Sequence, residues 1–436
     1  MTRPAPSPER AALYLAALAT PQLGVTTLLR LLEALGGIEA VANASASRLA
    51  RVAGVRAAVA AELHPTLRRE ERRARAAVAA ALAGGLSVHA WEDASFPRVL
   101  RDDPSGSALL LFVEGRLPPQ LDRSSRWARS CAVVGTRRAS AGGRGFARDL
   151  ARAAAREGLV VVSGLALGID GAAHEGALDA AAAADGAGAA PGWSRPRYRW
   201  APAADGAREP FPPGPAPTVA VLGGGHGRLH PAAHAGLARR ILAAGGAVVS
   251  QWPPDTQPTQ KSFLHRNRVI SGLARAVVVV EAGLRSGAHN TVAHALQQGR
   301  TVLAVPAAPW SATGAGCVRL LREGASPLAS EDDLFAEFAE LAPRPAATAA
   351  DAPGPDPHAG TGHGPTSAVS QGELPLGLTP VERVRRALAG AGELSLDALL
   401  AEVQLSPGAL VGLLARLELE GEVSATPGGR YRLRGA

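Results

Sequence analysis

The sequence predicts an α/β protein with a Rossmann-like, doubly wound and mostly parallel sheet, a small helical domain before it and a winged helix after it. The main observation is a series of short apolar runs that alternate with amphipathic segments between residues 130 and 340. Several of these runs are apolar at every position, as expected for strands covered by helices on both faces. Helical periodicity before this region and a Pro-rich break after it indicate separate modules.

The first part of the chain, residues 1–80, is expected to form a helical domain of the SAM or helix-hairpin-helix type. Apolar-Gly-apolar turns at 23–25 and 53–55 each precede a helical pattern. Glycine there leaves backbone N–H groups at a helix start facing outward, which suits DNA phosphates. A packing turn explains the same pattern equally well. The charged run 68–75 indicates a solvated helix face.

The second part, residues 81–341, is expected to be the Rossmann-like core. Strands that alternate with helices of this length indicate βαβ units. The predicted strands are residues 131–134, 159–162, 219–222, 247–249, 276–280 and 302–305. An Ala/Gly/Pro-rich segment, residues 181–217, separates a helix from the next strand and is interpreted as an insertion.

The last parts are a flexible linker at 342–377 and a winged helix at 378–436. We expect three helices and two short strands, at 380–388, 395–403, 407–420, 423–425 and 431–433, with Ser395 and Ser406 as N-caps. The third helix carries Arg416 but also Glu418 and Glu420, which makes a poor major-groove face. The module is therefore interpreted as an interaction or backbone-contact module.

The composition favours a polyanionic partner. The net charge is +8, the isoelectric point is about 10.6, and Lys261 is the single lysine. The two cysteines, Cys131 and Cys317, have no metal-ligand spacing and cannot form a disulfide framework. No apolar run reaches the roughly 18 residues that span a bilayer. We therefore expect a cytoplasmic protein without metal or cofactor.

The first predicted strand ends in a glycine turn that contains Gly135, Thr136, Arg137 and Arg138, and a helix begins near Gly143. Free N–H groups at the helix start, together with the helix dipole, predict an anion site. Glycine allows close approach of an oxygen, and the two arginines add charged contacts. Arginine replaces the second glycine of the dinucleotide fingerprint, and no P-loop is present.

The second predicted strand ends in a similar turn, with Ser163, Gly164 and Gly168 before Asp170 and His174. A functional pairing of Asp170 with His174 is one interpretation. We favour the other, in which Asp170 caps the helix and His174 lies on the helix surface.

A third segment combines basic residues with an aromatic one at a loop-to-helix transition. It contains Lys261, Phe263, Arg266, Asn267 and Arg268. This combination suits single strands, because the cations hold the backbone and the ring offers a stacking face. A core position explains Phe263 equally well.

Taken together, these segments resemble the DNA-processing protein A family, also called Smf. The matching stretches lie in the family's order at 134–137, 163–174, 263–273, 280–287, 298–300 and 324–325. The resemblance covers roughly residues 10–340 and extends to the winged helix.

The resemblance implies a dimeric, non-catalytic cytoplasmic protein that binds and protects single-stranded DNA in a basic pocket. It also implies a RecA-type recombinase as the partner, with a role in natural transformation or recombination. By position, Arg137 would contact phosphate and residues 263–268 would line the pocket. The predicted DNA-binding residues are Gly135, Thr136, Arg137, Arg138, Ser163, Gly164, Gly168, Lys261, Phe263, Arg266, Asn267 and Arg268.

The chain departs from the family pattern at Leu167, at Val318, at His230-Pro231 and in the insertion at 181–217. Leu167 stands where the family usually has a basic residue, which leaves one phosphate contact in doubt. The insertion carries aromatic and basic residues, for which we favour a simple surface loop over the alternative hypothesis that they are accessory DNA contacts. These residues are Trp193, Arg195, Arg197, Tyr198, Arg199 and Trp200.

Two other functions fit parts of the sequence. A Rossmann-type enzyme acting on nucleoside phosphates, such as a phosphoribohydrolase, shares the paired glycine turns and would use Glu281 or Asp170. Neither carboxylate has an obvious activating partner in the sequence. A winged-helix regulator with a ligand-sensing core is disfavoured by the apolar third helix.

Overall fold

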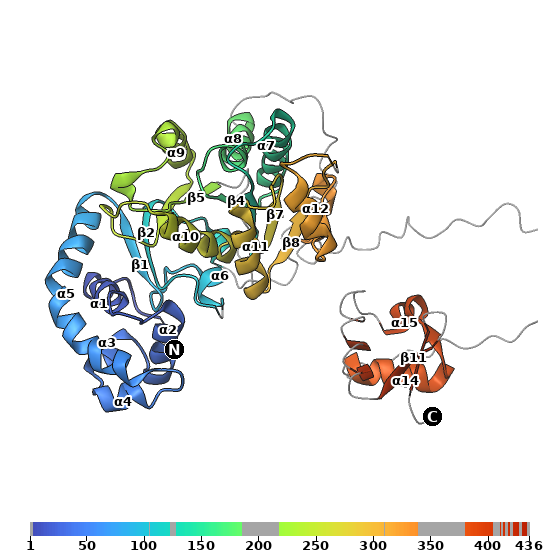
Figure 1. Ribbon diagram of the computed structural model, residues 1–436, viewed down its shortest axis with the longest axis horizontal. Helices are drawn as coiled ribbons and strands as arrows, with labels where there is room; N and C mark the ends of the chain where they lie inside the picture. Colours follow the sequence, from blue (N-terminus) through green and yellow to red (C-terminus); the bar gives the residue numbers. More distant parts are fainter. Residues whose placement is uncertain are drawn as a thin grey trace, which may run out of the picture. The chain divides into compact units, whose positions relative to one another are not determined.

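The computed structural model divides the chain into two compact units, Met1–Thr348 and Ala349–Ala436 (Figure 1). The described residues are 3–103, 105–122, 128–184, 218–308, 310–338, 380–403, 410, 413–414, 417–418, 422–426 and 430–433.

The first unit is built on a nine-stranded sheet with the order β1-β2-β6-β5-β4-β3-β7-β8-β9. Its strands are β1 (Ser87–Ala90), β2 (Leu110–Gly115), β3 (Ser130–Val134), β4 (Val160–Ser163), β5 (Thr218–Val221), β6 (Ala247–Ser250), β7 (Ala276–Val279), β8 (Thr301–Ala304) and β9 (Ser326–Pro327). All pairings from β6 to β9 are parallel, whereas β1 and β2 form an antiparallel edge. The predicted α/β class and each predicted strand are confirmed, while β1, β2 and β9 were not predicted.

Helices cover both faces of this sheet, which explains why its central strands are apolar at every position (Figure 1). One face is covered by α7 (Ala141–Arg156), α8 (Ile169–Ala184), α9 (Ala235–Ala243) and α13 (Glu331–Ala336). The other is covered by α6 (Arg98–Arg101), α10 (Gln260–Gly272), α11 (Ala288–Gln297) and α12 (Ala315–Arg322). Along β3, Cys131 and Val133 face the first set, whereas Ala132 and Val134 face the second.

The amino-terminal helices pack on the antiparallel edge of the sheet. They are α1 (Pro8–Leu18), α2 (Val25–Leu35), α3 (Ile38–Asn43), α4 (Ala46–Ala50) and α5 (Ala57–Ala83). Strand β2 serves two cores, because Leu110 and Phe112 point into the helical core while Leu111 and Val113 point into the sheet core. This alternation joins the predicted helical domain to the Rossmann-like region within one unit.

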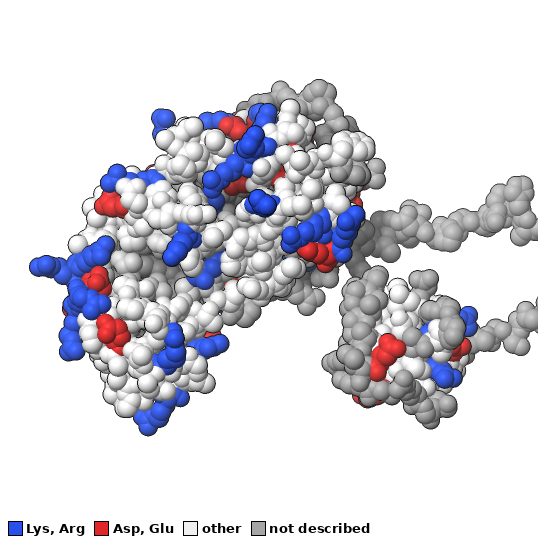
Figure 2. All heavy atoms as spheres, viewed as in Figure 1, with Lys and Arg blue, Asp and Glu red and all other residues white. Residues whose placement is uncertain are grey.

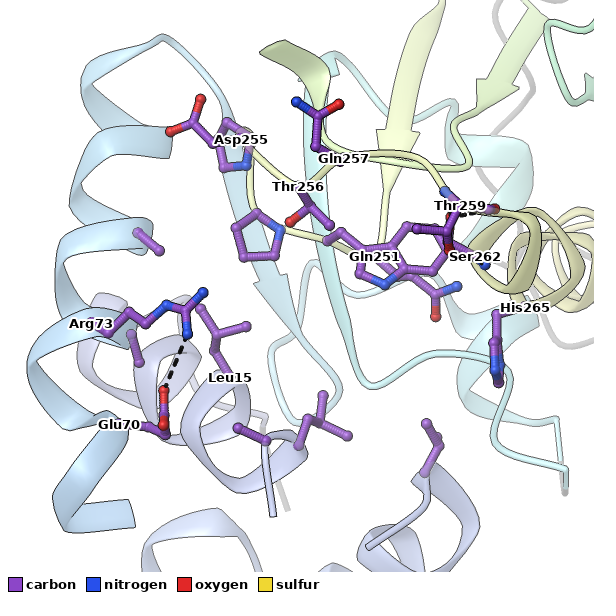
Figure 3. A pocket seen from close by; sticks show the side chains of 18 of the residues that line it. Leu15, Glu70, Arg73, Gln251, Asp255, Thr256, Gln257, Thr259, Ser262 and His265 are labelled. Carbon is purple, nitrogen blue, oxygen red and sulfur yellow. Dashed lines mark hydrogen bonds and ion pairs between the residues drawn. The ribbon is translucent and has the colours of Figure 1, made fainter. Parts of the chain in front are cut away.

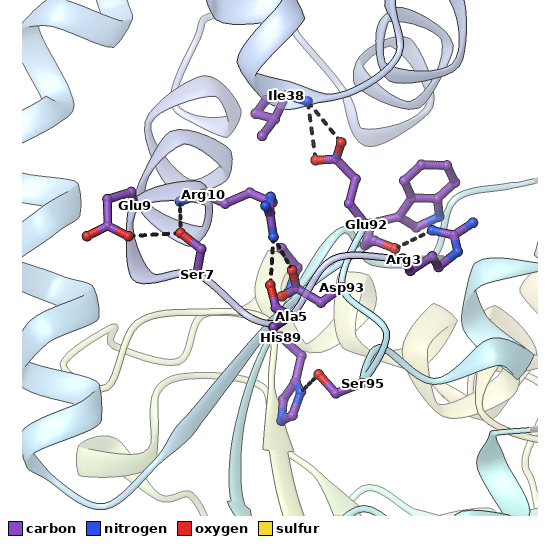
Figure 4. A network of polar contacts seen from close by, with 12 residues as sticks. Arg3, Ala5, Ser7, Glu9, Arg10, Ile38, His89, Glu92, Asp93 and Ser95 are labelled. Atoms are coloured by element: carbon purple, nitrogen blue, oxygen red, sulfur yellow. Dashed lines mark hydrogen bonds and ion pairs between the residues drawn. The ribbon is translucent and has the colours of Figure 1, made fainter. Parts of the chain in front are cut away.

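A polar network fastens these helices to the turn after β1 (Figure 4). The Arg10 guanidinium lies 2.8 Å from the Asp93 carboxylate, which is almost fully buried. Glu92 accepts hydrogen bonds from the Tyr14 hydroxyl at 3.0 Å and from the Ile38 N–H at 3.2 Å. Burial raises the pKa of the Glu92 carboxyl. Buried polar groups need hydrogen-bond partners, and here the partners of Asp93 and Glu92 come from the amino-terminal helices. The network therefore holds these helices against the turn after β1.

The second unit contains α14 (Pro380–Ala391), α15 (Leu396–Val403), β10 (Leu394–Ser395), β11 (Val423–Thr426) and β12 (Arg430–Leu433). Strand β12 pairs with both others in an antiparallel sheet over a core that includes Val384 and Leu399. The predicted winged helix is confirmed, and the Ser395 hydroxyl accepts the Ala398 N–H at 3.3 Å. Strand β10 was not predicted. Ser406, Arg416 and Glu420 lie outside the described residues.

Two other predictions fall partly or wholly outside the described residues. Helix α8 continues to Ala184, so the insertion predicted at 181–217 begins inside a helix. The accessory residues Trp193, Arg195, Arg197, Tyr198, Arg199 and Trp200 are not among the described residues. Within the described part of the chain, no helix is long and apolar enough to cross a membrane, and no group of His, Cys, Asp and Glu is arranged to hold a metal.

The prediction that His174 lies on a helix surface is wrong, because its side chain is fully buried between α8 and β5. Its Nδ1 lies 2.8 Å from the Thr218 hydroxyl, which itself donates to the Val161 carbonyl at 2.6 Å. The hydroxyl has one proton, so His174 Nδ1 must carry the hydrogen of the first bond. Burial, together with His234 and Arg266, lowers the pKa of His174 to about 3.

This buried histidine predicts a loss of stability in mild acid. The unfolded chain takes up a proton below the ordinary pKa of 6.5, whereas folded His174 stays neutral until about pH 3. Its contribution to the free energy of unfolding should therefore fall by about 2 kcal/mol between pH 7 and pH 5. Urea unfolding of the wild type and of His174→Gln at both pH values measures this. Equal pH dependence in the two proteins would contradict it.

Candidate functional site

The sheet has a topological switch point beside β3. The chain runs from β3 through β4 and β5 to β6 on one side, then returns to place β7 on the other side. At such a point the connections leave towards opposite faces, and a crevice opens at the carboxyl ends of the strands. A cavity of about 650 Å³ lies there, lined by the turn after β3, by α10 and by the start of α11. We refer to it as the switch-point cavity.

Phe263 on α10 lines this cavity with a half-exposed ring. The Arg137 guanidinium lies 5.2 Å from the centre of the ring, and the Arg266 guanidinium lies 5.7 Å from it. The His230 ring contacts it at a centroid distance of 5.6 Å. A side chain at Gly223 would begin 2.3 Å from the ring, so this glycine makes room for it. The ring is thus held in place by its surroundings and open to the cavity.

The glycines of the two turns serve chain packing. A Cβ atom at Gly135 would lie 2.5 Å from Ile169 and 2.8 Å from the Glu281 carbonyl oxygen. Gly168 has a φ of +82°, and a Cβ there would lie 2.3 Å from the Thr136 carbonyl oxygen. These packing contacts require glycine at 135 independently of the predicted close approach of a ligand oxygen. The two turns need glycine because they pack against each other.

The backbone N–H groups of the first turn are largely engaged within the chain. Thr136 N–H donates to the Glu281 carbonyl at 2.7 Å, and Ser140 N–H donates to the Glu281 carboxylate at 2.9 Å. Gly143 N–H donates to the Ser140 hydroxyl at 2.9 Å. The prediction of free N–H groups is wrong at these three positions, since Glu281 accepts the hydrogens of two of them and the Ser140 hydroxyl accepts the third. Attraction for an external anion is left to the exposed side chains of Arg137 and Arg138.

Arg266 lies inside the protein, with 4 % of its surface exposed. Its guanidinium donates to the carbonyls of Gly164 and Val221, the latter at 2.6 Å, and so joins the ends of β4 and β5. Burial lowers the pKa of Arg266 to about 10, and nearby Asp170 opposes this. The group therefore remains charged at neutral pH. This burial favours a role in positioning the cavity wall over the predicted direct DNA contact.

Other predicted residues also make internal contacts. The Ser163 hydroxyl is fully buried and donates to the Val133 carbonyl at 2.6 Å. The Asn267 amide donates to Asn290 at 3.2 Å and ties α10 to α11, although Asn267 also lines the cavity. Ser163, Gly164 and Gly168 line neither this cavity nor the one described next.

Helix α10 separates the switch-point cavity from a second cavity. Lys261, His265 and Arg268 line this second cavity, which has a volume of about 980 Å³ and lies between α10, the loop after β6, and helices α1 and α5 (Figure 3). We refer to it as the helix-side cavity. The predicted segment from Lys261 to Arg268 is thus divided, because Phe263, Arg266 and Asn267 line the switch-point cavity instead. Around α10, the charged side chains visible in Figure 2 are basic.

Sequence reasoning missed two parts of the wall. Thr259 caps α10 through a reciprocal pair of hydrogen bonds with Ser262 and lines both cavities. Ser286 and Thr291, from the turn after β7 and from α11, complete the switch-point cavity. Ser286 follows β7, the strand that pairs with β3 at the switch point. Knowledge of the strand order would therefore have predicted that Ser286 lies at this cavity. Leu167 is 47 % exposed and lines neither cavity.

Comparison with known proteins gives consistent matches. A family model described as DNA recombination-mediator protein A matches residues 87–189 and 214–339, and a DprA winged helix domain model matches residues 376–429. A putative DNA processing protein DprA of Mycobacterium tuberculosis is 36% identical over 340 residues, which is 76% of this chain and 71% of that protein. Protein Smf of Escherichia coli is 36% identical over 49% of this chain and 47% of its own length. The X-ray structure of DNA processing protein A from Streptococcus pneumoniae matches with a TM-score of 0.54 and 26% identity, over 75% of this chain and 97% of that one.

The two arginines that contact Phe263 are expected to differ in their effect on stability. Arg266→Ala should lower the free energy of unfolding by about 3 kcal/mol, because it leaves buried carbonyls and Asp170 without their partner. Arg137→Ala, at an exposed position, should change it by less than about 0.5 kcal/mol. Chemical denaturation of both variants measures the difference. Equal stability of the two variants would contradict the positioning role of Arg266.

Proposed function

This chain belongs to the DNA recombination-mediator protein A family, and from that premise we propose that it binds single-stranded DNA at the switch-point cavity without catalysis. The observation that carries the proposal is the pairing of exposed Arg137 with the open ring of Phe263 at the switch point. A guanidinium holds a phosphate, and an aromatic face stacks an unpaired base. The bases of a duplex are already stacked, so this pairing favours a single strand.

The internal contacts of the two candidate carboxylates support a binding function over a nucleoside-phosphate enzyme. Glu281 holds the turn after β3 through both its carbonyl and its carboxylate. Asp170 lines the switch-point cavity but is buried beside Arg266 and accepts the Ala166 N–H at 3.4 Å. A general acid or nucleophile must reach the substrate. Both carboxylates are engaged in contacts within the protein, and these contacts compete with a role as general acid or nucleophile.

Family membership also guides the proposal for partners and location. The relatives carry the names of DNA-processing proteins, and we extend that role to this chain in recombination or natural transformation. We further propose a cytoplasmic homodimer that assists a RecA-type recombinase. The winged helix would act as an interaction module. The proposed division is residues 1–80, 81–341, 342–377 and 378–436, with the boundary between the two compact units inside the linker.

Binding of fluorescent oligonucleotides tests the proposal directly. Arg137→Ala should weaken single-strand affinity by at least about tenfold, since a charged hydrogen bond contributes about 1.5–3 kcal/mol. The slope of log affinity against log salt should become shallower by about 0.7 for one lost phosphate contact. The matched control is Arg156→Ala, an exposed arginine at the far end of α7, which should bind like the wild type.

Three comparisons decide the outcome. The wild type should prefer single strands over duplexes of the same sequence, and its affinity should fall as salt rises. Equal affinity for both forms, or hydrolysis of nucleoside phosphates without strand binding, would contradict the proposal. If Arg137→Ala and Arg156→Ala had equal effects on affinity, the switch-point cavity would not be the binding site.

A further inference from the structure

We infer that the helix-side cavity is a second section of the same single-strand site. A strand that leaves the switch-point cavity would cross the start of α10 near Thr259 and Lys261, then place its next nucleotides against α1 and α5. This inference rests on the proposed function, since it extends the path of the strand bound there. It assigns a binding role to residues outside the predicted site, chiefly Trp252 and Arg73.

The two cavities share a wall residue at one end of α10. Thr259, the exposed N-cap of this helix, lines both of them. Beyond it, Gln260 and Leu264 face the switch-point cavity, while Lys261 and His265 face the helix-side cavity. Successive side chains of one helix therefore lie on both sides of the same ridge. A polymer that crosses this ridge at Thr259 would meet both cavities.

The helix-side cavity attracts an anion. Its wall includes Lys261, Arg268 and Arg73 against two carboxylates, Glu70 and Asp255. Among the described residues, Lys261 and Arg268 form no ion pair, and Arg73 reaches Glu70 only at 3.8 Å (Figure 3). Three cations against two carboxylates leave an excess of one positive charge, which favours a negatively charged ligand such as a phosphodiester.

The titration of His265 agrees with this positive field. Burial together with Arg268 and Lys261 lowers the pKa of the His265 imidazole, because a proton there is repelled. The facing loop contributes only Asp255 as a charged group, and α5 contributes Glu70 and Arg73.

The rest of the wall suits nucleotide bases. Trp252 is half-buried and lines the cavity beside the two prolines that follow it, opposite apolar side chains of α1 and α5 that include Leu15 and Ala77. Such surfaces accept base faces irrespective of sequence. A volume of about 980 Å³ is larger than that of the switch-point cavity and leaves room for a ligand of several rings.

Two hydrogen-bond donors in this wall have no acceptor among the described residues. They are Gln251 Nε2 and Arg268 Nε, both covered by neighbouring atoms. A buried donor without a partner costs about 1–3 kcal/mol. A rotation of either side chain towards the cavity would bring it to the phosphate or base oxygens of a strand. Cations, an aromatic ring and unpaired donors together favour single-stranded nucleic acid over a protein segment.

Oligonucleotides of two lengths distinguish binding at the switch-point cavity from binding at both cavities. A thymidine oligonucleotide of about 6 nucleotides should fill the switch-point cavity, whereas one of about 15 should reach both. Trp252→Ala should weaken binding of the long strand by at least about fivefold, the loss expected for one stacked base. Binding of the short strand should not change. Trp310→Ala, an 87 % exposed tryptophan that lines neither cavity, is the matched control.

A second pair of variants avoids any effect on the core. The Arg73 side chain is 88% exposed on α5, so Arg73→Ala should fold normally. It should weaken long-strand binding by about threefold, as expected for one exposed charge contact, and reduce the salt slope. The neighbouring Arg72 is exposed but does not line the cavity, and Arg72→Ala should bind like the wild type.

The outcomes for the two proposals are distinct. Unchanged long-strand affinity in both Trp252→Ala and Arg73→Ala would overturn the inference, and a cavity that holds a protein segment would give this result. Equal losses for short and long strands would overturn it as well. Retained sensitivity to Arg137→Ala in those cases would leave the proposed function intact. Failure of the wild type to bind either strand would instead contradict the proposed function.

Discussion

The buried charge of Arg266 is the constraint on which the site depends. A guanidinium taken out of water must keep its hydrogen bonds, and here the ends of β4 and β5 provide them while Asp170 provides the counter-charge. These contacts fix α10 against the carboxyl edge of the sheet. They also leave no space for a side chain at Gly164, where a Cβ atom would lie 2.4 Å from the guanidinium. Phe263, one turn earlier on α10, is consequently held at the mouth of the switch-point cavity.

Helix α10 connects the interior to both cavities through three faces. Val269 and Ile270 belong to the sheet core, Phe263 faces the switch-point cavity, and Lys261 faces the helix-side cavity. The residues that the sequence analysis took as one basic and aromatic segment therefore lie on different faces of the helix, and the residues that follow them pack in the core. Helical periodicity of 3.6 residues per turn produces this division, since neighbours in sequence point in different directions.

The sequence predicted the parallel strands well because their apolar runs reflect burial on both faces. It did not predict β1, in which Ser87 and His89 alternate with apolar residues on a short antiparallel edge. The burial of His174 and Arg266 was also missed. Residue type alone does not reveal burial of a polar group, which depends here on partners far away in sequence, such as Thr218. The sequence located the glycine turns correctly. Their packing against each other depends on β3 and β4 being neighbours in the sheet, which the sequence did not show.

The internal contacts of the two glycine turns favour a polymeric ligand over a small nucleotide. In a dinucleotide site, glycines and free N–H groups bring the backbone itself against a pyrophosphate at a fixed position. Here the Glu281 carboxylate already accepts the Ser140 N–H at the start of α7, and the glycine space is filled by Ile169 and neighbouring carbonyls. The remaining attraction comes from long, exposed side chains such as Arg137. Such side chains can follow phosphates at variable positions, and stacking on Phe263 accepts any base. Both properties suit a strand that must be held without reading its sequence.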